Sequence, residues 1–155
     1  MPVGDDTHYY RGDLPHLLTP VKTYFVTFCT SKRFELSPTA RDIVLTQLGR
    51  AHRIAYCLHC GIVMPDHVHL IVTPYDEVTL ANVLQWIKGA SAFYVNSHLQ
   101  RTGRLWQRES FDHILRNGES IRAKSDYVCL NPVRAGLVAR VQDYPWLWNL
   151  YPLES

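Results

Sequence analysis

The chain has 155 residues, of which 46% are hydrophobic and 19% are charged, and its formal net charge is +2. This size fits one compact domain, and we expect a single domain over residues 1–155 with its core at about residues 20–140. No apolar run approaches the roughly 20 residues that cross a bilayer, and the polar stretch from Met1 to Asp13 lacks the apolar segment of a signal peptide. We therefore expect a cytoplasmic protein that has no membrane partner.

The cysteines are too few and too irregularly spaced for the disulfide framework of a small secreted protein, so we expect reduced thiols. Cys57 and Cys60 flank His59 and together look like half of a zinc knuckle. On a regular strand, however, Cys57 and Cys60 would point to opposite faces, and no second pair follows at zinc-site spacing. The sequence therefore predicts no zinc site here.

Apolar periodicity and turn residues divide the chain into four strands and three helices. The β-branched and aromatic residues from Tyr24 to Thr30 are typical of a strand, and Ser37-Pro38 is typical of a helix start. Leu80, Val83 and Ile87 recur at helical spacing. The strands are expected at residues 24–30, 55–64, 67–72 and 105–116, the last with a bulge, and the helices at 38–55, 80–99 and 119–130.

The order of the first six elements is strand, helix, strand, strand, helix, strand, which is the order of ferredoxin-like folds. In that architecture, which RRM domains share, helices cover one face of an antiparallel sheet. Pro65-Asp66 is short enough for a hairpin turn, so the second and third strands should pair antiparallel. We therefore predict an α+β fold in which the strand that starts at His67 is central.

His67 and His69 lie on one face of this predicted strand, because successive side chains of a strand point to opposite faces. Val68, Leu70 and Val72 lie on the other face and would hold the strand against the core. Two imidazoles on one face can converge on a divalent cation. An isolated His-x-His also occurs on exposed strands that bind nothing, so a metal site needs support from the rest of the chain.

Tyr127 and Asn131 are four residues apart at the end of the last predicted helix, so their side chains lie on one face, one turn apart. Pro132 should end the helix, because the residue before a proline is disfavoured in the α conformation. A single tyrosine at such a place is usually an interface aromatic. Together, Tyr127 and Asn131 can reach a common site.

The chain resembles the REP-associated tyrosine transposases, of the single-tyrosine HUH transposase superfamily. The motifs that carry this resemblance are Met64-Pro65-Asp66-His67-Val68-His69-Leu70 and Tyr127-x-x-x-Asn131-Pro132-Val133-Arg134-Ala135-Gly136-Leu137-Val138. Further similar segments are 24–28, 88–89, 105–107 and 111–113, so the resemblance covers about residues 9 to 144.

The resemblance implies a metal-dependent enzyme that cuts and rejoins single-stranded DNA near hairpins through a covalent 5′-phosphotyrosine. It implies that Tyr127 is the nucleophile and that His67, His69 and Asn131 hold Mg²⁺ or Mn²⁺, which would stabilise the charge of the scissile phosphate. The expected partner is single-stranded or hairpin DNA of REP-like palindromic repeats. Asn rather than Gln at position 131 implies a monomer, with a dimer that exchanges the tyrosine helix as the alternative.

Residues 101–140 carry seven Arg and one Lys against four acidic residues, a local net charge of +4. The guanidinium fork of Arg binds phosphate oxygens bidentately, so this segment suits a DNA backbone. An ordinary solvated helix surface would carry the same charges. The candidate DNA-binding residues are Lys88, Arg108, Arg116, Arg122, Lys124 and Arg134.

Two other functions fit part of the pattern. A domesticated protein could bind a DNA or RNA hairpin without cutting it, and a small phosphodiesterase could use the histidines with water as the nucleophile. Neither needs a tyrosine beside a metal-competent pair, so we expect the transposase-type enzyme. His113 could approach the active site or be structural, and Trp106 could stack on a base or lie in the core.

Overall fold

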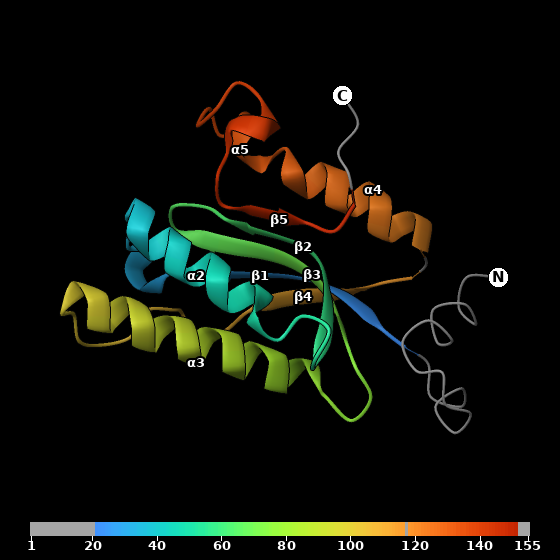
Figure 1. Cartoon of the computed structure of the whole chain (residues 1–155), viewed down its shortest axis with the longest axis horizontal. Helices are drawn as coiled ribbons and strands as arrows, with labels where there is room; N and C mark the ends of the chain where they lie inside the picture. Colours follow the sequence, from blue (N-terminus) through green and yellow to red (C-terminus); the bar gives the residue numbers. More distant parts are fainter. Residues whose placement is uncertain (1–20, 117, 152–155) are drawn as a thin grey trace.

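The computed structural model describes residues 21–116 and 118–151, so the polar stretch from Met1 to Asp13 lies outside the described residues. Five strands form one antiparallel sheet in the order β4-β1-β3-β2-β5. Figure 1 shows the helices arranged around this sheet. The strands are β1 (Thr23–Cys29), β2 (Tyr56–Val63), β3 (His67–Pro74), β4 (Phe111–Leu115) and β5 (Leu147–Asn149).

Two long helices cover one face of the sheet, as predicted, and the last helices lie on the other face (Figure 1). The predicted α+β architecture and the central place of β3 are confirmed. The helices are α2 (Pro38–Arg50), α3 (Leu80–Leu99), α4 (Gly118–Cys129) and α5 (Asn131–Arg134), with short 3₁₀ turns at Ser31–Arg33 and Val141–Asp143.

The first face holds a core that is built from both long helices. Val68, Leu70 and Val72 of β3 are fully buried there, together with Val44 of α2 and Val83 of α3. Burying apolar area of this kind is the main favourable term in folding, worth roughly 25 cal/mol per Å². The alternation that the sequence shows along β3 is therefore the reason that this strand presents its histidines to the opposite face.

A second apolar cluster holds α4 against the opposite face of the sheet. Ile121, Val128 and Cys129 of α4 pack with the buried residues of this face, among them Ile71 of β3. The Sγ atoms of Cys129 and of Cys60 on β2 lie 3.8 Å apart. The helix that carries Tyr127 is thus anchored on the histidine side of the sheet, away from α2 and α3.

A bulge in β2 contradicts the prediction made for its two cysteines. The register shifts between Leu58 and Cys60, so Cys57 and Cys60 face the same side: Cys57 pairs with Thr73, and Cys60 with Ile71, both on the side of α4. The prediction that the two cysteines point to opposite faces is therefore wrong, because it assumed an unbroken alternation. Cys60 contacts Cys129 rather than joining Cys57.

Three further features of the secondary structure also differ from the prediction. The first helix ends at Arg50 and not at Ala55, since residues 51–55 form a turn in which the backbone N–H groups of Ile54 and Ala55 bond to Ala51. The segment 105–107 is not part of a strand, because Trp106 makes only an isolated bridge to Thr30. Strand β5 was not predicted at all; its three residues pair with β2.

His59 of β2 is buried between two hydroxyl groups. Its Nδ1 lies 2.8 Å from the Tyr151 hydroxyl, and its Nε2 lies 2.8 Å from Oγ1 of Thr73. Burial, and to a smaller extent the charge of His52, lowers the pKa of His59 to about 4. A folded-state pKa below the ordinary value of 6.5 means that the unfolded chain binds this proton more readily.

We expect the stability of the protein to fall as the pH is lowered from about 6.5 towards 4, with His59 contributing about 1.4 kcal/mol per pH unit. Above pH 6.5 this contribution is constant, because the ring is neutral in both states. Urea unfolding of the wild type and of His59→Gln at several pH values measures it. The variant should have the shallower slope in this window, and equal slopes would contradict the assignment.

Candidate active site

The two histidines of β3 lie side by side, and each ring is oriented by a hydrogen bond at Nδ1. Their ring centroids are 4.8 Å apart. Nδ1 of His67 lies 2.8 Å from a carboxylate oxygen of Asp66, and Nδ1 of His69 lies 2.7 Å from the hydroxyl of Thr27. Both rings can therefore present Nε2 to a ligand. Metal-binding histidines are usually oriented in this way, by a partner on the other ring nitrogen.

Asp66 connects His67 to a third side chain. Its second carboxylate oxygen accepts a hydrogen bond from Nε of Arg33, at 2.9 Å. Burial alone would raise the pKa of Asp66, but the hydrogen bonds from Arg33 and His67 outweigh it and hold the pKa below its ordinary value. Asp66 is therefore a stable anion beside His67. Sequence reasoning missed the roles of Arg33, Asp66 and Thr27; the only sequence signal was that Asp66 precedes His67.

His69 is held in its neutral form by its surroundings. Burial, followed by the charges of His67, Lys124 and Arg134, lowers the pKa of His69 to about 4. Near neutral pH the ring therefore keeps a free lone pair, as a metal ligand requires. The same result shows that Lys124 and Arg134, from the other end of the chain, lie close enough to act on this histidine.

Tyr127 faces the same side of the molecule. Its side chain is 56% exposed, and its ring lies 4.1 Å from the guanidinium of Arg134 and 5.0 Å from the ammonium of Lys124. Lys124 also lies 4.4 Å from the ring of Phe25, which stacks on His69 with ring centroids 5.6 Å apart. An unbroken series of contacts thus leads from the tyrosine to the histidine pair.

Asn131 lies one turn beyond Tyr127, at the start of α5. Its side-chain amide donates a hydrogen bond of 2.9 Å to the carbonyl oxygen of Val128, which leaves its Oδ1 as an acceptor. Within residues 21–116 and 118–151, no group of three His, Cys, Asp or Glu side chains could hold a metal ion. A third side-chain ligand beside the two histidines would therefore have to be an amide or a hydroxyl.

The family model described as "Transposase IS200 like" matches residues 23–128, which include both histidines and Tyr127. The chain belongs to the IS200-like transposase family. The resemblance found in the sequence is confirmed by two relatives. A REP-associated tyrosine transposase of Escherichia coli K12 is 29% identical over 140 residues, which cover 84% of this chain and 82% of that protein. A protein of Haemophilus influenzae with a similar name is 28% identical over 94 residues.

The match to the Haemophilus protein covers 54% of this chain, and the chain spans 53% of that protein. Two solved structures share the fold. One, a REP-associated tyrosine transposase bound to a REP hairpin, has a TM-score of 0.64 at 24% identity and covers 81% of this chain and 75% of that one. A transposase structure from Deinococcus radiodurans has a TM-score of 0.50 at 24% identity and covers 72% and 90%.

The candidate DNA-binding residues of this chain do not form one surface. Lys124 and Arg134 lie beside Tyr127 and His69, and Arg116 is exposed just after β4. Arg122 instead lies 3.8 Å from Asp126 and 5.7 Å from the ring of Tyr151. Among the residues that the structure describes, no helix could cross a membrane.

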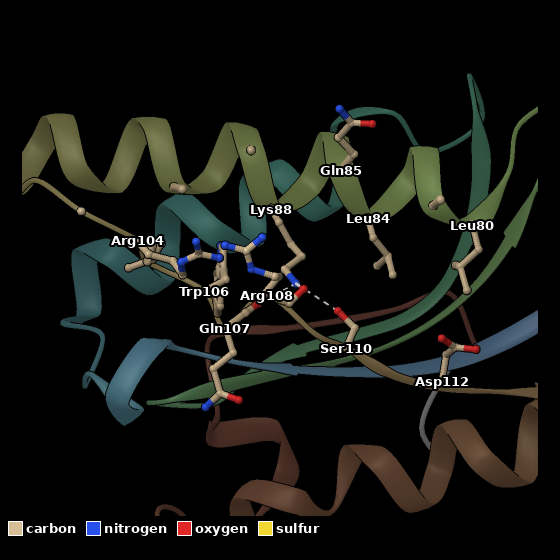
Figure 2. Close-up of a pocket in the computed structure, with 15 residues that line it drawn as sticks. Leu80, Leu84, Gln85, Lys88, Arg104, Trp106, Gln107, Arg108, Ser110 and Asp112 are labelled. Carbon is tan, nitrogen blue, oxygen red and sulfur yellow. Dashed lines mark hydrogen bonds between the residues drawn. The ribbon is translucent and has the colours of Figure 1, made fainter.

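Lys88 and Arg108 lie on the α3 side of the sheet, where they line a pocket of about 680 Å³ between α3 and residues 103–112 (Figure 2). Nζ of Lys88 donates to the carbonyl oxygens of Gln107 and Arg108, at 2.9 and 3.3 Å, and to the Ser110 hydroxyl at 3.0 Å. Lys88 thus holds the loop that leads into β4.

Trp106 is only 3% exposed, so the prediction that this residue lies in the core is confirmed.

We expect Lys88→Met to lower the free energy of unfolding by about 1–2 kcal/mol, because three hydrogen bonds to one ammonium are lost. Arg108→Met is the matched control, since that side chain is exposed and only its backbone carbonyl is used. Urea unfolding of both variants measures the difference. Equal stabilities would show that Lys88 does not hold the loop.

Proposed function

We propose that this transposase cuts and rejoins single-stranded DNA beside hairpins, with Tyr127 as the nucleophile. The observation that carries the proposal is the shared environment of Tyr127 and His69. Lys124 and Arg134 contact the tyrosine ring and also lower the pKa of the histidine. The nucleophile and the histidine pair can therefore act on one phosphate group.

We propose His67, His69 and Asn131 as the ligands of a Mg²⁺ or Mn²⁺ ion. The fit is supported by the donor set: two imidazoles oriented through Nδ1 and one amide oxygen left free by the hydrogen bond of its NH₂ group. When bound, the ion would supply positive charge to the scissile phosphate and to the leaving oxygen. Asp66 and Thr27 would hold the two rings in place.

In the proposed step, the phenolate oxygen of Tyr127 attacks the phosphorus, and the bond from phosphorus to the 3′ oxygen breaks. The phenolic proton goes to solvent, and the leaving 3′ oxygen takes up a proton. The products are a 5′-phosphotyrosine and a free 3′-OH, which can attack the phosphotyrosine later and rejoin the strand. Lys124 and Arg134 each place a positive charge against the Tyr127 ring, where the anionic phosphate would bind.

Hairpin DNA of the REP type is the proposed substrate. It is supported by the solved relative of the same fold, which is bound to a REP hairpin. We propose that the tyrosine acts within its own chain. Ile121, Val128 and Cys129 anchor α4 on the sheet of the same chain, which is the arrangement that a monomer requires.

Tyr127→Phe should fold and bind hairpin DNA like the wild type but should form neither a nicked product nor a covalent adduct. The ring is kept, and only the attacking oxygen is lost. Incubating the protein with hairpin oligonucleotides from the flanks of its own gene and Mn²⁺, followed by denaturing electrophoresis, measures both products. Tyr94→Phe, which removes the hydroxyl of a partly exposed tyrosine on α3, is the control and should remain active.

Two outcomes of this experiment favour the other functions. If Tyr127→Phe still nicks DNA, then water is the nucleophile and the protein is a phosphodiesterase. If the wild type forms no adduct on any of these hairpins but binds them, then the protein is a hairpin-binding module.

Thr27→Val should reduce the affinity for Mn²⁺ by about 10- to 100-fold without unfolding the protein, because it removes the hydrogen bond that orients His69. His67→Ala and His69→Ala should abolish the binding. Titration calorimetry with Mn²⁺ measures these affinities. Thr46→Val, on an exposed part of α2, is the control. An unchanged affinity of Thr27→Val would remove Thr27 from the support of the metal site.

A further inference from the structure

Strand β4 forms the edge of the sheet next to β1 (Figure 1). Asp112 pairs with Val26, whose side chain is buried under α2 and α3. Because side chains alternate along a strand, Phe111 and His113 point to the opposite face, where the two histidines of β3 lie. The edge strand thus contributes two aromatic rings to the face of the proposed active site.

The register of the sheet places Phe111 in line with His69. Thr27 of β1 pairs with Phe111 on one side and with His69 on the other. Neighbouring strands are about 4.8 Å apart, so the backbones of Phe111 and His69 lie roughly 10 Å from each other. That separation is comparable with the size of a nucleotide.

Ring contacts connect the same two residues along the surface. The ring centroids of Phe111 and His113 are 6.0 Å apart, those of His113 and Phe25 are 5.3 Å apart, and Phe25 stacks on His69. The first two contacts are edge-to-face. Edge-to-face contacts favour a set angle between neighbouring rings, and Phe111 keeps most of its surface exposed.

Phe111 is far more exposed than Phe25, an aromatic residue of β1 on the same face of the sheet. Its side chain is 65% exposed, whereas Phe25 is 8% exposed and lies under the ammonium of Lys124. A large exposed apolar ring costs solubility and gains nothing for the core. Here it lies at the border of a surface on which Lys124 and Arg134 supply positive charge.

We propose that Phe111, in edge-to-face contact with His113, is the stacking surface for an unpaired base next to the phosphate that is cut. This inference rests on the proposed function and adds a positioning residue to it. A nucleotide of single-stranded DNA has a flat apolar base and an anionic phosphate. The phosphate would lie between the histidines and Tyr127, and the base would lie on Phe111, about one nucleotide away.

The role of such a contact is to select the phosphate and not the base. A phenyl ring has no hydrogen-bonding group, and stacking on it tolerates every base. Holding one base at a set distance from His69 determines which phosphate reaches Tyr127. We therefore expect Phe111 to affect both the affinity for the unpaired strand and the position of the cut.

The experiment measures the affinity for a hairpin oligonucleotide with a single-stranded tail, in EDTA so that the strand stays intact. An abasic site is moved through the tail one nucleotide at a time. Phe111→Ala is compared with the wild type, with Phe111→Trp as the rescue variant. Phe93→Ala is the matched control, because Phe93 is 67% exposed but lies on α3, on the other side of the sheet.

Phe111→Ala should weaken binding of the intact oligonucleotide by about 5- to 100-fold. One tail position should cause a similar loss in the wild type when it is abasic, and at that position Phe111→Ala should lose nothing further. Phe111→Trp should restore the affinity, and Phe93→Ala should bind like the wild type. With Mn²⁺, Phe111→Ala should also cut at neighbouring phosphates.

Two results would overturn the inference: Phe111→Ala binds like the wild type, or its loss adds in full to the loss at every abasic position. The first would leave the edge strand open to a protein partner instead of DNA. Both results can be seen whether or not the wild type forms an adduct, so the failure of the inference is distinct from the failure of the proposed chemistry. A wild type that does not bind the hairpin overturns both.

Discussion

The antiparallel pairing of β1 with β3 determines where both histidine rings point. It places Thr27 opposite His69 and Cys29 opposite His67. A slip of one residue would move every side chain of β3 to the other face, so that Val68, Leu70 and Val72 would lose their places under α2 and α3. The apolar core therefore sets the register, and the register brings Nδ1 of His69 within hydrogen-bond distance of Thr27.

The helices on the two faces of the sheet have different roles, one in the stability of the fold and the other in the proposed chemistry. α2 and α3 bury the apolar side of the sheet, while α4 covers only part of the side that carries the histidines. On α4 itself, Val128 and Cys129 are buried and their neighbour Tyr127 is exposed. The helix can therefore be held firmly against the sheet while it presents one side chain to the surface between Lys124 and Arg134.

The charges of the site come from distant parts of the chain and act through short distances. Asp66, which pairs with Arg33, contacts His67 from the turn before β3, and Lys124 and Arg134 act on His69 from the last helices. The cations that act on His69 are therefore two residues, Lys124 and Arg134, of the Arg-rich segment 101–140. Others in that segment are used elsewhere: Arg140 pairs with Asp143 at 3.1 Å, and Arg101 lies over Phe34 at 4.5 Å.

The sequence by itself determined the α+β fold, the central place of β3 and the family, because these follow from local patterns: alternation along strands, helical spacing, and the motifs around His67 and Tyr127. It could not show the bulge in β2, the three-residue strand β5 or the loop held by Lys88, since each depends on partners far away in the chain. Only the tertiary structure decided which hydroxyl and which cations face the histidines. Sheet register and the docking of α4 result from packing over the whole molecule, and no local stretch of sequence encodes them.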